Sequence, residues 1–185
     1  MKNTIAAVSL AFIIVLSGLT TCGSKEKTDN PVPKTDAAEP AVTHIGTGNF
    51  SLEWVRTASN ITFTLKGKST GWIALMVDPK NKMKDGDIYI GYVKDGKAYM
   101  QDEFGVQPWK HQPDTELGGK DQILSCEGTE KDGFTEIKFV VDLTSRDQFD
   151  STFGPGDHHL VFAAGPDDSF TSKHNQLAMI GTRFQ

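Results

Sequence analysis

The side chain with the clearest capacity for chemistry is a methionine in a charged turn. Met83 lies between Lys82 and Lys84 in the stretch DPKNKMKDGDIYIGYVKDGK, residues 78–97. Among charged neighbours a thioether contributes little to apolar packing, whereas its soft sulfur is able to bind a metal. These residues alone leave two interpretations open: a loop side chain folded over the edge of the core, or a sulfur ligand.

Imidazole groups are the second set of candidate ligands, and the chain has five: His44, His111, His158, His159 and His174. His158 and His159 are adjacent in an expected strand, so they point to opposite faces and do not form a simple chelate. His111 and His174 each lie in a long connection rich in proline, glycine and charge, residues 105–120 and 165–176. Connections of this length in a compact domain are often functional.

Motifs for hydrolytic chemistry are absent from the sequence. It contains no His-x-Glu-x-x-His, no paired Cys-x-x-Cys, no Gly-x-Ser-x-Gly and no glycine-rich phosphate loop. Residues 78–87 are acidic, but Pro79, Lys80 and Lys82 interrupt the spacing of a calcium loop. A secreted metal-dependent enzyme that uses His158, His159 and acidic neighbours is therefore only a third hypothesis.

The first residues have the features of an export signal. Lys2 precedes an apolar run over residues 5–19, which is short for a membrane span, and Cys22 follows it. This arrangement resembles a bacterial lipoprotein cleavage site. We therefore expect a signal peptide over residues 1–21, lipidation of Cys22, and an extracytoplasmic protein anchored to a bacterial membrane. A secreted or periplasmic protein is the alternative.

Composition sets the domain organisation. Residues 22–44 are polar and contain three prolines, which predicts a flexible tether, and residues 45–185 have the length of one domain. The chain has 19 Lys and Arg against 24 Asp and Glu, a net charge of −5, without a basic cluster, so we expect no nucleic-acid partner. With Cys22 lipidated, Cys126 has no disulfide partner, and we expect it to be a buried small hydrophobe.

Hydrophobic periodicity predicts the fold class. Short runs with period two are separated by Gly, Asp and Pro, and no convincing helical stripe is present. Residues 71–77, GWIALMV, are apolar on both faces, which is typical of a central strand. Asp95-Gly96 and Asp132-Gly133 predict tight hairpins. The sequence therefore predicts an all-β domain, an antiparallel, immunoglobulin-like β-sandwich of about nine strands.

Four blocks of the chain resemble the DOMON family. They are GWIALMVDPKNKMKDGDIYIGYVKDGKAYMQDEF, QPDTELGGKDQIL, EKDGFTEIKFVVDL and HHLVFAAGPDDSFTSKHN, and they occur in family order with family-like spacing. The resemblance covers about residues 48–176. It implies a DOMON-type β-sandwich, and many members of this family bind b-type haem without a covalent bond.

The resemblance also implies a ligand pair. Cytochrome-type members hold haem between a Met in the turn before the Asp-Ile strand and a His in the late loop, which are Met83 and His174 here. Lys173 stands where the family often has the first histidine of a pair. Trp72, Phe104 and Phe170, together with Trp109, are the side chains that we expect to form the apolar wall of a haem slot.

The leading hypothesis is therefore a haem b electron carrier near a membrane, with an unidentified redox partner protein and no catalytic role of its own. A thioether opposite an imidazole raises the reduction potential relative to two imidazoles, and six-coordinate iron favours electron transfer over oxygen chemistry. The alternative is a DOMON module without haem that binds a sugar or another small ligand.

Overall fold

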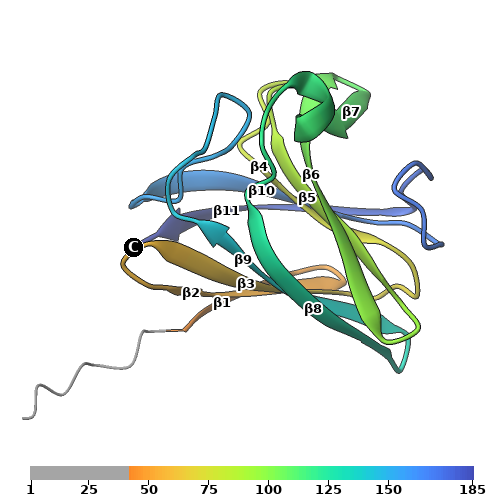
Figure 1. Cartoon of the computed structure of the whole chain (residues 1–185). Coiled ribbons are helices and arrows are strands. Elements are labelled where there is room, and N and C mark those ends of the chain that lie inside the picture. Colours follow the sequence, from red (N-terminus) through yellow and green to blue (C-terminus); the bar gives the residue numbers. More distant parts are fainter. Residues whose placement is uncertain (1–41) are drawn as a thin grey trace, which may run out of the picture. The chain divides into compact units, whose positions relative to one another are not determined.

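The computed structural model describes residues 42–185, which form two antiparallel sheets (Figure 1). The five-stranded sheet has the order β1 (Thr43–Thr47), β2 (Phe50–Arg56), β3 (Asn60–Gly67), β9 (Phe134–Asp142), β8 (Ile123–Lys131). The six-stranded sheet has the order β11 (Gln176–Phe184), β10 (Gly156–Ala164), β4 (Ile73–Val77), β5 (Asp87–Lys94), β6 (Lys97–Gln107), β7 (Lys110–Pro113). A short 3-10 helix, η1 (Asp114–Leu117), follows β7. Within these residues no helix is long and apolar enough to cross a membrane.

The expected all-β sandwich is confirmed, and so are both Asp-Gly hairpins. Asp95 and Gly96, which join β5 to β6, have φ angles of 52° and 73°. Asp132 and Gly133, which join β8 to β9, have φ angles of 54° and 79°. These left-handed conformations match the right-handed twist of the paired strands.

The structure differs from the sequence prediction at three places. β1 begins at Thr43, before the expected boundary at residue 45, and His44 is exposed on it beside Glu53. The expected loop 105–120 contains the end of β6, all of β7 and η1, whose polar residues give no period-two signal. Cys126 is exposed rather than buried, because β8 is the edge strand of its sheet and residues 124–127 are exposed whichever face they occupy. Residues 1–41, with the expected signal, Cys22 and most of the tether, lie outside the described residues.

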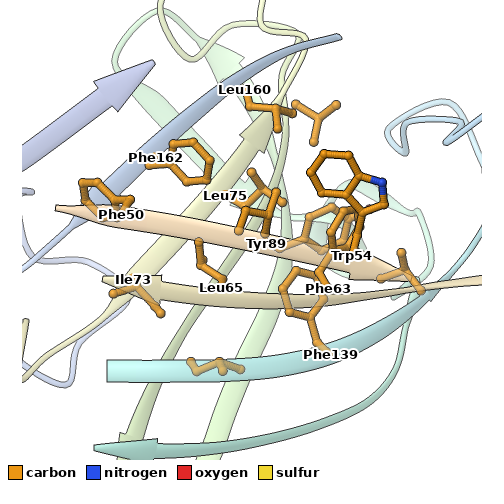
Figure 2. Close-up of a cluster of buried hydrophobic side chains, with 14 of the residues drawn as sticks. Phe50, Trp54, Phe63, Leu65, Ile73, Leu75, Tyr89, Phe139, Leu160 and Phe162 are labelled. Carbon is orange, nitrogen blue, oxygen red and sulfur yellow. The ribbon is translucent and has the colours of Figure 1, made fainter. Parts of the chain in front are cut away.

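One hydrophobic core lies between the two sheets (Figure 2). Phe63 of β3 and Phe139 of β9 come from the five-stranded sheet, with ring centroids 5.4 Å apart. Leu75, Tyr89 and Phe162 reach them from the six-stranded sheet and are almost completely buried. Each such side chain contributes about 1.5–3 kcal/mol when it leaves water, so this core supplies most of the stability.

A second apolar cluster lies on the opposite face of the six-stranded sheet. All five residues of β4 are buried, and alternate ones point to opposite faces, so Ala74 and Met76 belong to this cluster while Leu75 belongs to the core. Ile90 of β5 and Val161 of β10 extend the cluster across neighbouring strands. No strand of the five-stranded sheet contributes to it. The apolar run seen in the sequence therefore serves two separate layers.

Candidate functional site

A pocket of about 360 Å³ lies over this outer cluster. Its floor consists of apolar side chains from three adjacent strands: Ala74, Met76, Ile88, Ile90, Val161 and Ala163. The loops before β5 and before β11 form its rim, and each carries one of the expected ligands. Met83 and His174, 91 positions apart in the chain, line the same pocket.

The turn that carries Met83 has an unusual backbone. Asp78, Lys82 and Asp85 have φ angles of 50°, 58° and 61°, in the left-handed region that costs energy for residues other than glycine. The Met83 amide donates to the carbonyl of Pro108 (3.3 Å), and the Asp85 amide donates to that of Gly105 (2.8 Å). These bonds fasten the turn to the β6–β7 hairpin and hold the half-buried Met83 at the pocket.

Glycine at position 105 permits this close approach. A Cβ atom there would lie 1.6 Å from the carbonyl oxygen of Met83, a distance that no side chain tolerates. The position of the methionine therefore depends on a glycine that is 22 residues further along the chain. This requirement arises only after β6 has folded beside the turn.

Trp72 holds the loop that carries His174. Its indole Nε1 donates to the Ser172 hydroxyl (2.8 Å), and its backbone amide donates to the Asp167 carbonyl (3.0 Å). The indole lies so close to Gly165 that a Cβ atom there would be 1.9 Å from Nε1. The tryptophan thus acts as a pocket wall and also as an anchor for the loop. His174 itself is exposed at the rim.

His111, which the sequence offered as a candidate imidazole without assigning it a role, is a third possible ligand at this pocket. It lies on β7, lines the pocket, and pairs through Nδ1 with the carboxylate of Glu103. The Glu103 residue is only 3% exposed. The pair depends on the β6–β7 hairpin, whose second strand had no sequence signal. Lys173 also lines the pocket.

The expected wall residues are only partly brought together. Trp72 and Trp109 line the pocket, and Trp109 is 73% exposed with the Lys82 ammonium 3.2 Å from its ring centroid. Phe170 packs against Tyr92 (centroids 4.9 Å apart) and lines an adjoining hollow rather than this pocket.

Phe104, which was expected to form part of the wall, does not line this pocket. Its ring lies 5.2 Å from that of Phe149. Gln101 and Glu103 of β6 line the hollow beside the pocket, and the residues that alternate with them point to the other side of the sheet. A one-residue difference in strand phase therefore separates Phe104 from the site.

The adjacent histidines lie away from the pocket. His158 Nδ1 is 2.7 Å from Asp78 Oδ2, and the His158 ring is 4.7 Å from that of Phe184. His159 is exposed, and its backbone amide donates to Asp78 Oδ1 (2.7 Å). These contacts fix the start of the Met83 turn, and the two imidazoles do not share a ligand position.

Comparisons with known proteins place the fold. Residues 46–165 match the DOMON domain model, and the chain belongs to this family. It is 33% identical over 57 residues to the human DBH-like monooxygenase protein 1 and 26% identical over 121 residues to the mouse protein. These stretches cover 31% and 65% of this chain but only 9% and 19% of the relatives.

Two solved structures share the fold at low sequence identity. The cytochrome b domain of pyranose dehydrogenase from Coprinopsis cinerea aligns with a TM-score of 0.53 and 12% identity, over 77% of this chain and 81% of that one. The cytochrome domain of cellobiose dehydrogenase from Myriococcum thermophilum aligns with a TM-score of 0.55 and 12% identity, over 78% and 82%. At this identity the likeness concerns the fold.

Proposed function

We propose that this DOMON domain binds one b-type haem in the pocket and carries electrons, with Met83 and His174 as the axial ligands. The observation that carries the proposal is that a thioether and an imidazole, held by two separate loops, line one apolar pocket. The cytochrome domains with the same fold give independent support.

The pocket fits haem in the chemistry of its lining. Apolar side chains cover its floor, and the donor set is the sulfur and imidazole pair that holds low-spin iron. When bound, the haem supplies reversible one-electron chemistry. Met83 and His174 would hold the iron, and Trp72 and Ile88 would keep water away from the haem. Iron held by two protein ligands would favour electron transfer over catalysis.

The setting of this electron carrier is a further part of the proposal. We propose that lipidated Cys22 anchors the protein to a bacterial membrane outside the cytoplasm and that a redox partner protein meets it there. Replacement of Cys22 with Ala should release the protein from the membrane fraction. A wild-type protein found soluble with an unmodified amino terminus would contradict this part and leave the haem site untouched.

A second candidate function, binding of a sugar or similar small ligand without haem, has one observation in its favour. The hollow of about 700 Å³ beside the pocket is lined by polar side chains such as Gln101 and Gln112 and by the exposed ring of Trp109. An exposed aromatic face beside hydrogen-bonding groups suits a carbohydrate. A colourless protein that takes up no added haem would favour this function.

The absorption spectrum of the full chain, expressed with its signal, tests the haem proposal. We expect a Soret band, low-spin bands after dithionite, and the weak near-infrared band of a methionine–iron bond in the ferric state. Met83→Ala should abolish the near-infrared band and lower the reduction potential, while Met83→His should restore low-spin iron at a lower potential. The matched control is Met100→Ala, because Met100 packs against the inner core. Loss of the band in Met76→Ala or Met100→Ala, with retention in Met83→Ala, would overturn the assignment.

A further inference from the structure

Four aspartates converge in the sandwich, and none of them lines the pocket. Asp87 begins β5, Asp102 lies on β6, Asp114 begins η1, and Asp150 lies between β9 and β10. The first three are 2%, 4% and 0% exposed. Carboxylate oxygens of Asp102, Asp114 and Asp150 all lie within 4.8 Å of one another. Four segments of the chain therefore bring acidic groups together, three of them buried and that of Asp150 half-buried.

Hydrogen bonds from the backbone fix the orientation of three of these carboxylates. Asp87 Oδ2 accepts a hydrogen bond from the backbone amide of Ser151 (2.7 Å), and Asp102 Oδ2 accepts one from that of Gln122 (2.6 Å). Asp150 Oδ2 accepts two, from the backbone amides of Arg146 and Asp147 (2.6 and 3.0 Å). In all three the Oδ1 atom is buried and has no hydrogen-bond partner among the described residues. One oxygen of each group is thus anchored and the other is left free.

Asp114 gives an independent indication of a ligand. It is completely buried, and neither of its carboxylate oxygens has a hydrogen-bond partner within residues 42–185. An unsatisfied buried polar group costs about 1–3 kcal/mol, and more when it is charged. A chain that placed such a group here without a compensating partner would lose a large part of its stability.

Cationic side chains do not neutralise the cluster. No ion pair between described residues includes any of the four aspartates, and Arg146 directs its Nε to Asp142 (2.5 Å). Burial, followed by repulsion between the carboxylates, raises the pKa of Asp87 to about 7, of Asp114 to about 8 and of Asp102 to about 9. The cluster therefore takes up positive charge near neutral pH, either as protons or as a metal ion.

We infer that Asp102, Asp114 and Asp150, with Asp87 beside them, form a binding site for a hard divalent cation, and that Ca²⁺ is the ion that the site favours. The carboxylate oxygens of Asp102, Asp114 and Asp150 lie within 4.8 Å of one another, so a single cation can contact all three. Ca²⁺ binds six to eight oxygens at about 2.3–2.6 Å in a flexible geometry. Mg²⁺ demands near-octahedral geometry and gives up its water reluctantly, so a buried cage of carboxylates suits it less well.

The cation has a structural role in this arrangement. It ties η1 and the segment between β9 and β10 to the paired strands β5 and β6. Asp87 follows the Met83 turn directly, after Gly86, so the site also secures the strand that supports that turn. The inference does not depend on haem, because none of these carboxylates lines the pocket.

Thermal unfolding of the full chain at pH 7.5 tests the site. After treatment with EGTA, addition of 1 mM Ca²⁺ should raise the Tm by about 5–10 °C, and Mg²⁺ should raise it less. Asp114→Asn and Asp150→Asn should each remove most of this shift. Glu116→Gln is the matched control, because Glu116 lies exposed on the same short helix and its removal changes the net charge equally. At pH 5.5 the Ca²⁺ shift should shrink, because protons compete for the same oxygens.

Terbium gives a direct readout that does not depend on stability. The Tyr89 hydroxyl lies 2.9 Å from Asp87 Oδ2, so Tb³⁺ bound in the cage should emit strongly when the phenol is excited. The Asp114→Asn variant should lose most of this emission, and the Glu116→Gln variant should keep it. Excess Ca²⁺ should displace the Tb³⁺ from the wild-type protein and so remove the emission. A wild-type Tm that does not respond to Ca²⁺, or an Asp114→Asn variant that responds as fully as the wild type, would overturn the site and leave a cluster of shared protons.

Discussion

The two faces of the six-stranded sheet are both apolar, but they are covered in different ways. Leu75 and Phe162 on the inner face pack against the five-stranded sheet and are fully buried. Ala74 and Val161, their neighbours in the chain, face outward and are covered only by loops. A sheet packs continuously against a sheet, whereas two loops of irregular shape leave a pocket of about 360 Å³ between them.

The difference shows how one sequence pattern can serve stability and binding together. A strand with apolar residues at every position supplies a core on one side and a ligand surface on the other. Small residues on the outer side, Ala74 and Ala163, leave space over the sheet, while larger ones on the inner side fill it. Polar and coordinating groups enter the pocket from its edges: Met83 and His174 come from loops, and His111 comes from β7.

The change with the largest expected effect on the outer face is His174→Ala. It removes the stronger of the two proposed ligands, so haem retention should be almost abolished while the fold remains. The haem-to-protein ratio of the purified protein measures the effect, and circular dichroism checks the fold. Lys173→Ala, at the adjacent pocket-lining residue, is the matched control and should keep its haem. Equal loss in both variants would show that the loop, rather than the imidazole, is what matters.

A matched pair of truncations compares the two faces directly. Leu75→Ala in the enclosed inner core should lower the free energy of unfolding by about 2–5 kcal/mol. Ile90→Ala should cost the haem-free protein less, because the space it opens joins an existing pocket instead of forming a new enclosed cavity. Urea unfolding of both haem-free variants measures the difference. Equal costs would show that the outer face is packed as tightly as the core.

A smaller effect is expected when the loop anchor is weakened. Ser172→Ala removes the acceptor for the Trp72 indole, a hydrogen bond of 2.8 Å, and such a bond contributes about 1 kcal/mol. Haem affinity should therefore fall about fivefold while the ligand set stays the same. Haem transfer to an acceptor protein measures the affinity, and an unchanged near-infrared band confirms the ligands. A variant with wild-type affinity would show that the tryptophan positions the loop without this bond.

Local patterns in the sequence carried much of the fold. Alternation and the two Asp-Gly turns predicted the sandwich, because the period of a strand and the geometry of a tight turn depend on adjacent residues. The resemblance to the DOMON family indicated Met83 and His174, and the structure brings both to one pocket. Their role as haem ligands stays a prediction.

Other features depended on partners far away in the chain. The strand phase of β6 put Phe104 on the wrong side for a pocket wall, and the place of β8 at the edge of its sheet left Cys126 exposed. The pairing of His111 with Glu103 required β7, a polar strand without a sequence signal.

By itself, then, the sequence determined the strands, the hairpins and the doubly apolar central strand. Only the tertiary structure decided which aspartates of the chain lie together in the buried cluster. Asp102 and Asp114 belong to different segments, and Asp150 comes from a connection that follows much later in the chain. The sequence suggested an acidic character for residues 78–87, but only Asp87 of that stretch belongs to the buried cluster. Burial and the approach of like charges exist only after the two sheets close, and for that reason no local pattern could reveal them.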